Sequence, residues 1–268
     1  YKDQFYSTMK RRMGVSNDTK VSLISIQKYA KNLGSYGSGS DRVAVVYASG
    51  EIVGGRGDGS QIAAEDMAAT LKKVREDDRI KAVVFRIDSR GGSSLASEII
   101  WREAKLLAEE KPLITSMSDV AASGGYYIAT PSHKILAEPT TITGSIGVFG
   151  LIPNAQKLLN NKLGINFDYV GTGKHSDIGR IDRNMTADER AYIEEIIDRI
   201  YSTFLSRVSE GRNMTTEEVH EIAQGRVWTG VMAREVGLVD ELGGLHKAIK
   251  LAAEQAHLSE YKVKEYPK

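Results

Sequence analysis

The chain has 268 residues, with 36 basic and 35 acidic side chains and a formal net charge of +1. This near balance argues against a protein that binds by neutralising phosphates, so no nucleic-acid partner is expected. The composition, with 41% apolar residues and no cysteine, is that of a globular protein without disulfides, thiolate metal sites or a cysteine nucleophile. The apolar runs are too short to span a bilayer, and the length permits one large α/β domain or two small ones.

The first part of the chain predicts a helix, a loop and a strand. Residues 2–13 have a helical pattern that Gly14 ends, and residues 20–26 are a strand candidate. Residues 34–41, GSYGSGSD, have the composition of a flexible connector. We therefore expect three regions, namely residues 1–33, a Gly/Ser linker at 34–41 and a main domain at 42–268.

From residue 42 onward, strands and helices alternate. Strands are predicted at 42–48, 81–88, 112–117 and 134–138, and helices at 61–76, 95–110 and 123–130. Alternation at this spacing favours βαβ units and a mainly parallel sheet, so the predicted class is α/β. The second half is more helical, with helices predicted at 153–162, 186–210, 215–224, 229–236 and 244–256.

The two ends of the chain resemble each other weakly. A helix, a polar loop and a Lys-Val pair occur at 2–26 and again at 244–266, with the pairs at Lys20-Val21 and Lys262-Val263. One interpretation is coincidence. The other is that residues 1–33 are the tail of a preceding copy of the same unit.

Two glycine-containing turns follow predicted strands. SRGGSS at 89–94 leaves backbone N–H groups open for a phosphate or an oxyanion, but it also fits a tight βα turn. Ser123 lies in AASGG, where small neighbours allow a substrate to approach, but it also fits a helix N-cap. The surroundings of Ser123 do not match the G-x-S-x-G elbow, which disfavours an α/β-hydrolase.

Two further loops carry candidate side chains. Ser145 lies in TTITGSIGVFG, and Lys174 lies in GTGKHSD, which fails as a Walker A loop because His175 follows the lysine. A turn and a solvated surface charge are the simpler interpretations of these two residues. A Ser-His-Asp triad using His175 and Asp177 lacks motif support. The five histidines show no metal-ligand spacing, so no metal is expected. No other cofactor is predicted either.

The order of five blocks resembles the signal peptide peptidase A, or protease IV, family of S49 serine peptidases. The blocks are RIDSRGGS, SMSDVAASGGYYIAT, TTITGSIGVFG, VGTGKHSD and IAQGRVWTGVMAREVGLVDELGG. The resemblance covers about residues 42–257 and implies a ClpP/crotonase-like spiral of ββα units. One departure is Arg90, which stands where the family's Ser-Pro-Gly-Gly has proline, so the fixed φ of that proline is lost.

The resemblance also implies site residues. Ser123 would be the nucleophile, and the backbone N–H groups of Gly91, Gly92 and Gly124 would form the oxyanion hole. The family's general base is a lysine, and Ser145 would orient its amine. Lys174 lies in the expected loop, although Ser176 is an alternative for that position.

The source of the base stays open at this point. In two-repeat members, the N-terminal repeat supplies the lysine and the C-terminal repeat supplies the serine. The weakly repeated ends make this chain resemble such a C-terminal repeat, in which case the base comes from a preceding repeat.

The resemblance further implies what the enzyme acts on and where. The substrates would be apolar signal-peptide remnants with small residues near the cut, on the extracytoplasmic (periplasmic) side of a bacterial cell membrane. The family forms homo-oligomeric rings, and a segment outside this chain would provide the membrane association. Two alternatives remain, a crotonase-like acyl-CoA enzyme and a non-catalytic half that needs a partner repeat for its base.

Overall fold

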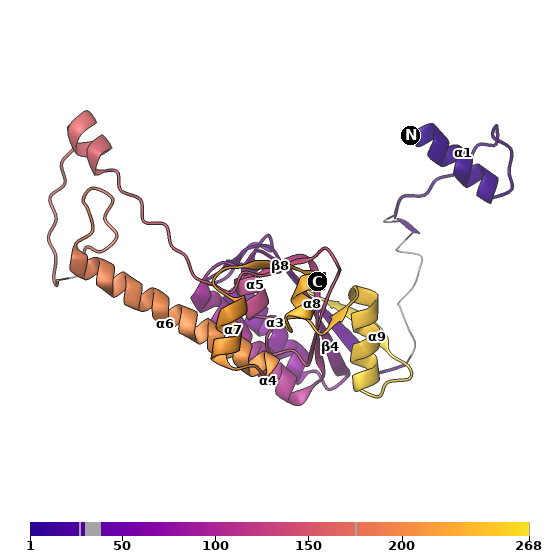
Figure 1. Cartoon of the computed structure of the whole chain (residues 1–268). Helices are drawn as coiled ribbons and strands as arrows, with labels where there is room; N and C mark the ends of the chain where they lie inside the picture. Colours follow the sequence, from indigo (N-terminus) through magenta and orange to yellow (C-terminus); the bar gives the residue numbers. More distant parts are fainter. Residues whose placement is uncertain (27, 30–38, 175, 268) are drawn as a thin grey trace. The chain divides into compact units, whose positions relative to one another are not determined.

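A computed structural model describes residues 1–26, 28–29, 39–174 and 176–267 (Figure 1). The chain divides into two compact units, Tyr1–Gly37 and Ser38–Lys268. The division falls inside the connector predicted at 34–41, of which residues 34–38 lie outside the described residues. The assignment of the first unit to a preceding repeat stays a prediction.

The first unit contains helix α1 (Lys2–Arg12), which ends before Gly14 as predicted. No residue of α1 is buried. The strand predicted at 20–26 is wrong, because these residues adopt no strand conformation. A strand exists only where a partner strand bonds to its backbone, and the described residues of this unit provide none.

The second unit begins with alternating strands and helices, as predicted. Its elements up to the middle of the chain are β1 (Arg42–Ser49), β2 (Ile52–Val53), β3 (Ile62–Ala63), α3 (Ala64–Glu76), β4 (Ile80–Ser89), α4 (Ser94–Glu110), β5 (Leu113–Ala122), α5 (Gly124–Tyr127), β6 (Lys134–Ala137) and β7 (Ile142–Gly144). Strand β5 runs five residues beyond the strand predicted at 112–117, as far as the residue before Ser123.

The rest of the second unit is mainly helical. Its elements are the π-helical turn η1 (Lys157–Lys162), α6 (Ala187–Arg212), α7 (Thr216–Ile222), β8 (Val227–Thr229), α8 (Gly230–Glu235), β9 (Glu241–Leu242), α9 (Leu245–Gln255) and β10 (Lys262–Tyr266). The helices predicted from residue 186 onward are confirmed, and the helix predicted at 153–162 is reduced to η1.

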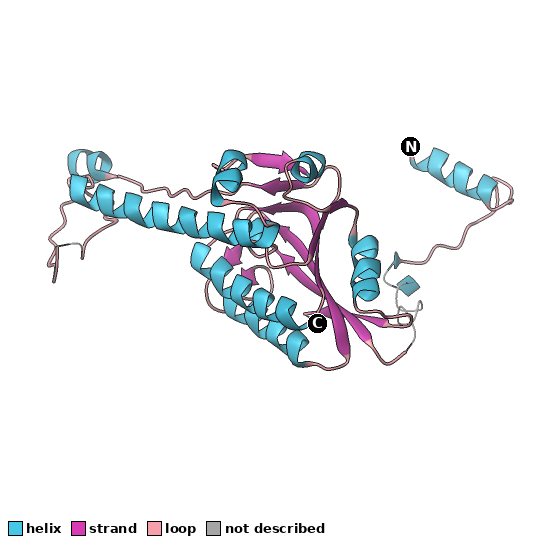
Figure 2. Ribbon diagram, turned by 60° about the horizontal axis from the view of Figure 1, so that its bottom comes forward, coloured by secondary structure: helices cyan, strands magenta, loops and turns pink. Residues whose placement is uncertain are grey.

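Among the described residues, the main sheet has eight strands, and helices cover both of its faces (Figure 2). The central order is β10-β1-β4-β5-β6-β9, and each of these neighbouring pairs is parallel. Strand β7 pairs in parallel with the end of β5, and β8 pairs antiparallel with β7. The predicted α/β class with a mainly parallel sheet is therefore confirmed.

The core lies on both sides of the sheet. Along β1, Val43 and Val45 belong to the cluster that contains the buried face of α9, whereas Ala44 and Val46 belong to the cluster on the side of α3 and α4. Burial on both faces explains why the strands are continuous apolar runs rather than alternating ones. The result is a rigid layer whose strand ends can hold a site in place.

Candidate active site

The predicted site lies where β4 and β5 end. These strands are parallel neighbours, and Ser89 at the end of β4 is in register with Ala121 of β5. The loop that contains Gly91 and Gly92 therefore lies beside Ser123, which follows β5. Carboxyl ends of parallel strands are a common location for ligand sites in α/β proteins.

Ser123 occupies a strained turn between strand and helix. Its backbone has φ 52° and ψ −122°, a region that non-glycine residues rarely adopt and that costs about 1–3 kcal/mol. Backbone bonds hold the turn, because the Ser123 N–H donates to Gly144 O at 2.9 Å and the Tyr127 N–H donates to Ser123 O at 2.9 Å. The geometry is that of a nucleophile elbow, although the sequence lacks G-x-S-x-G.

The hydroxyl of Ser123 does not cap the helix that follows it. Ser123 is the N-cap residue of α5, but its side chain makes no capping hydrogen bond. Within the part of the chain that the structure describes, no hydrogen bond to Ser123 Oγ is found. The N-cap interpretation of this serine therefore does not explain its position, and its hydroxyl is available to a substrate.

The helix after Ser123 is anchored by two tyrosines. The Tyr126 hydroxyl donates to Leu238 O at 2.8 Å, and the Tyr127 hydroxyl donates to the carboxylate of Glu98. Arg207 of α6 also binds Glu98, with its Nη2 2.5 Å from Oε1. Burial, and then the hydrogen bond to Glu98, raise the pKa of Tyr127, so this hydroxyl stays a donor. These contacts fix the backbone on which Ser123 stands.

Of the three backbone donors predicted for an oxyanion hole, one is already engaged. The Gly91 N–H donates to Ser89 Oγ at 3.1 Å. The N–H groups of Gly92 and Gly124 have no hydrogen-bond acceptor among the described residues. Gly91 packs tightly here, since a Cβ on it would lie 2.6 Å from Gly124 N and 2.9 Å from Ser123 Cβ. Both N–H groups are therefore unengaged, with Gly92 exposed and Gly124 buried.

Ser123 and Ser145 line one cavity of about 730 Å³. Gly91 and Gly92 line it as well, so the structure brings these predicted site residues together. Ser145 has φ 48°, and its backbone N–H donates to Arg226 O at 2.7 Å, which holds the loop after β7 at the cavity. Ser145 as the residue that orients a lysine stays a prediction.

The charged residues of this cavity are not among those predicted from the sequence. Its lining includes three carboxylate residues and one cation, namely Glu51, Asp88, Asp119 and Arg90. The signal was weak, because each is a single charged residue next to a strand end. Only the parallel pairing of the strands brings the four to one cavity.

Lys174 does not line the Ser123 cavity. Its side chain is 73% exposed, and its Nζ lies 2.6 Å from Asp188 Oδ2 in the first turn of α6. Figure 1 shows the long helix α6, and Lys174 belongs to the segment that leads into its N-terminal end. Ser176, the alternative for this position, donates through Oγ to Gly173 O at 2.7 Å. His175 lies outside the described residues.

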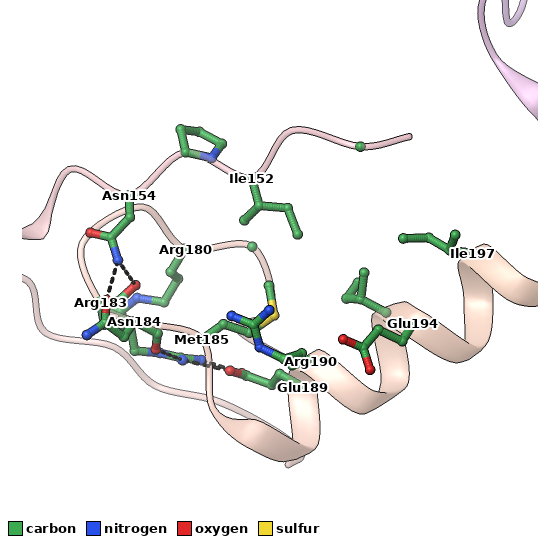
Figure 3. A pocket seen from close by; sticks show the side chains of 14 residues that line it. Ile152, Asn154, Arg180, Arg183, Asn184, Met185, Glu189, Arg190, Glu194 and Ile197 are labelled. Atoms are coloured by element: carbon green, nitrogen blue, oxygen red, sulfur yellow. Dashed lines mark hydrogen bonds and ion pairs between the residues drawn. The ribbon is translucent and has the colours of Figure 1, made fainter. Parts of the chain in front are cut away.

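A second cavity, of about 640 Å³, lies between the start of α6 and the segment before it (Figure 3). Arg183 joins Asp177, 2.9 Å away, to the carboxylate of Glu189, which is only 3% exposed. These ion pairs, together with the bond between Glu189 and the Thr186 N–H, order the N-terminal end of α6. None of the predicted site residues lines this cavity.

Comparison with known proteins decides the family. Residues 105–259 match the model of peptidase family S49. A putative protease of Synechocystis is 39% identical, over 75% of this chain and 73% of its own length. The chain belongs to peptidase family S49. Members of this family are serine peptidases, so the resemblance predicted from the five blocks is confirmed.

Two further S49 relatives differ from the chain in length. The chloroplastic serine protease SPPA of Arabidopsis thaliana is 40% identical over 96% of this chain but only 39% of its own length. A putative signal peptide peptidase SppA of Enterococcus faecium is 36% identical over 75% of this chain and 59% of its own length. The chain thus spans about two fifths of the chloroplastic relative.

The described residues contain neither a metal-binding cluster nor a membrane-spanning helix. No group of three histidine, aspartate or glutamate residues among them stands close enough to hold a metal ion. No helix in the same residues has the length and apolar character needed to cross a membrane.

Proposed function

We propose that this S49 chain hydrolyses peptide bonds with Ser123 as the nucleophile. The observation that carries the proposal is the free hydroxyl of Ser123 on a strained elbow, beside the unengaged N–H groups of Gly92 and Gly124. Two convergent N–H donors stabilise the oxyanion of a tetrahedral intermediate, and one such donor is worth about 2.7–4 kcal/mol.

The reaction follows from these positions. Ser123 Oγ attacks the scissile carbonyl carbon while a base accepts its proton, and the carbonyl oxygen becomes an oxyanion facing Gly92 and Gly124. Collapse breaks the C–N bond, the amine leaves with the proton from the base, and an acyl-enzyme remains. Water then attacks the ester, releases the acid product and restores the serine.

We infer that the base is a lysine from another S49 domain. A lysine acts as a base only when neutral, and burial is what favours the neutral amine. Lys174 is 73% exposed and pairs with Asp188, outside the Ser123 cavity. A lysine supplied from outside this chain would be buried as it entered the cavity, where Ser145 lies ready to hydrogen-bond its amine.

The N-terminal unit supports the idea of a preceding repeat. Helices α1 and α9 both have 11 residues, and each is followed by a left-handed residue, Gly14 or His257. Both end in the same pair of Schellman hydrogen bonds. These bonds are Gly14 N–H to Arg11 O at 3.2 Å, Val15 N–H to Lys10 O at 3.1 Å, His257 N–H to Glu254 O at 3.0 Å and Leu258 N–H to Ala253 O at 2.9 Å.

The two helices differ in what covers them. Helix α9 buries Ala248, Ile249 and Ala252, and the strand after it, β10, pairs with β1. The matching positions of α1 are Phe5, Tyr6 and Met9, and Phe5 is 64% exposed. We propose that residues 1–33 belong to a preceding S49 repeat, whose sheet α1 covers as α9 covers this one.

The finer assignments are likewise proposals. We infer a ClpP/crotonase-like spiral, supported by the parallel sheet and the elbow at the end of β5. The proposed substrates are remnant signal peptides, apolar with small residues near the cut. The name of the Enterococcus relative, a putative signal peptide peptidase, supports signal peptides as the substrate class. The proposed setting is the extracytoplasmic side of a bacterial membrane, with homo-oligomeric assembly.

Fluorophosphonate labelling tests the nucleophile. With a second S49 domain to supply the base, the chain should be labelled at Ser123, and Ser123→Ala should abolish labelling. A crotonase-like acyl-CoA enzyme needs no serine there, so a folded protein that is not labelled, alone or with a second S49 domain, would favour that alternative.

Reconstitution tests the source of the base. We expect the 268-residue chain to hydrolyse a small-residue peptide ester only after an S49 domain carrying its own lysine is added, and Lys174→Ala to leave that activity unchanged. Full activity of the chain alone, lost on Lys174→Ala, would make Lys174 the base. The active preparation is the chain alone if it hydrolyses the ester, and otherwise the chain together with the added S49 domain.

A further inference from the structure

Three hydrogen bonds hold the loop between β4 and α4. Ser89 Oγ accepts from the Gly91 N–H at 3.1 Å, Gly91 O accepts from the Ile52 N–H at 2.9 Å, and Ile52 O accepts from the Ser93 N–H at 2.8 Å. The last two bonds form a parallel bridge between Ile52 and Gly92. The loop is therefore fixed on one side by strand β2 and on the other by the side chain of Ser89.

These bonds single out one donor. The N–H groups on either side of Gly92, those of Gly91 and Ser93, are both engaged, whereas the described residues offer no acceptor to the Gly92 N–H. Gly92 is also part of the wall of the Ser123 cavity. The free donor of the loop is thus the one that a substrate carbonyl in this cavity would meet.

We propose that Ser89 is a positioning residue that aims the Gly92 N–H at the reacting carbonyl, an inference that rests on the proposed role of Ser123. Ser89 is 2% exposed, and its Oγ is the acceptor for the Gly91 N–H. Without this acceptor, the Gly91 peptide would carry a buried, unsatisfied N–H, and it would rotate to find another partner. Rotation of that peptide would also turn the following one, which carries the Gly92 N–H.

The residue at position 90 makes this side-chain bond more important. Arg90 does not fix its own φ as a proline would, so the start of the loop has no covalent restraint. Ser89 cannot shift easily, because the glycine at 125 packs on it: a Cβ at Gly125 would lie 2.6 Å from Ser89 O and 3.2 Å from Ser89 Cβ. The Ser89 hydroxyl, which α5 holds in place, therefore orients the loop that carries the Gly92 N–H relative to Ser123.

The test is Ser89→Ala in the active preparation. We expect kcat for a peptide ester to fall about 10- to 100-fold with KM changed less than about threefold, because an oxyanion donor acts mainly in the transition state. Affinity for a peptide boronic acid, whose tetrahedral adduct places an oxygen at the donors, should fall by a similar factor. Affinity for the matching peptide amide should not change. Ser89→Thr, which keeps a hydroxyl, should recover most of kcat.

Ser132→Ala is the matched control. Ser132 is also buried, at 5% exposed, and its Oγ lies 2.7 Å from Thr115 Oγ1, away from the residues that line the cavity. It should lower the melting temperature about as much as Ser89→Ala while leaving kcat and boronate affinity unchanged. Equal kinetic effects of the two variants would reduce Ser89 to a structural role.

The outcomes separate the two proposals. Unchanged kcat and boronate affinity in a folded Ser89→Ala protein would overturn the role of Ser89 but not that of Ser123. Undiminished hydrolysis by Ser123→Ala would overturn the proposed function, and the role of Ser89 with it. If kcat fell and the affinities for the boronic acid and for the amide fell equally, Ser89 would shape the surface that binds the peptide and would not orient the Gly92 N–H.

Discussion

Gly92→Ala is the sharpest test of whether the Gly92 N–H, in the loop between β4 and α4, is an oxyanion donor. A Cβ at this position would lie 2.1 Å from Ile52 O and 2.8 Å from Ile52 C and N. Since such contacts are essentially never shorter than 3.0 Å, the loop or strand β2 must move by about 0.9 Å. The φ of +155° at Gly92 also disfavours an L-residue.

A displacement of this size is enough to misplace the Gly92 N–H. Misplacement by about 1 Å costs roughly 10²-fold in rate, and complete loss of one oxyanion donor costs roughly 10²–10³-fold. We therefore expect kcat of the active preparation to fall by about 10²–10³-fold, with a much smaller change in KM. The assay is steady-state hydrolysis of a small-residue peptide ester, with circular dichroism to show that the protein is folded.

Gly54→Ala is the matched control for this substitution. Gly54 follows the same strand β2, and a Cβ there would meet nothing within 4 Å. It should leave kcat and the melting temperature nearly unchanged. If folded Gly92→Ala kept kcat within about threefold of the parent, the Gly92 N–H would not be an oxyanion donor.

Three further predictions follow from other contacts. Ser123→Ala should abolish ester hydrolysis without lowering the melting temperature, since its Oγ has no partner among the described residues to lose and the elbow strain remains; turnover near that of the parent would exclude it as nucleophile. The hydrogen bond from Arg79 lowers the pKa of Asp77 from 3.8 to about 2. The ionised Asp77 therefore stabilises the folded protein fully above about pH 4, and this stabilisation is lost as pH falls through about 2. Urea unfolding should show this loss of folding free energy in the parent and not in Asp77→Asn. Among the described residues, the cavity is lined by three carboxylates and by Arg90 as its one cation, so a cationic peptide ester should be cleaved with higher kcat/KM than its neutral analogue. This preference should shrink in Asp119→Asn and at high salt, and an unchanged preference in that variant would remove Asp119 from substrate selection.

The sequence by itself determined the sheet and the family. Strands such as β1 and β4 are buried on both faces, so their apolar runs are visible without a structure. The helices from α6 onward also follow from local patterns, since caps such as Thr186 and Thr215 depend on neighbours a few residues away. Ser123 is a candidate for the same reason, because small neighbours next to a strand and the order of the blocks both point to it.

Local patterns gave a wrong or incomplete result where the partner lies far along the chain. The strand predicted at 112–117 is too short, because β5 continues to Ala122 and pairs with β7 in that part. Residues 20–26 have a strand-like sequence but no described partner strand, so they form none. Pairing, not composition, decides whether such a segment becomes a strand.

The tertiary structure alone decided how the site is assembled. The sequence cannot show that the Gly91 N–H is engaged by Ser89, which leaves Gly92 as the free donor, or that the hydroxyl of Ser123 makes no cap. Nor can it show that Lys174 is exposed beside Asp188 and away from the cavity. The physical reason is that hydrogen-bond partners and burial depend on which strand ends meet in space, and that arrangement follows from the packing of the whole sheet.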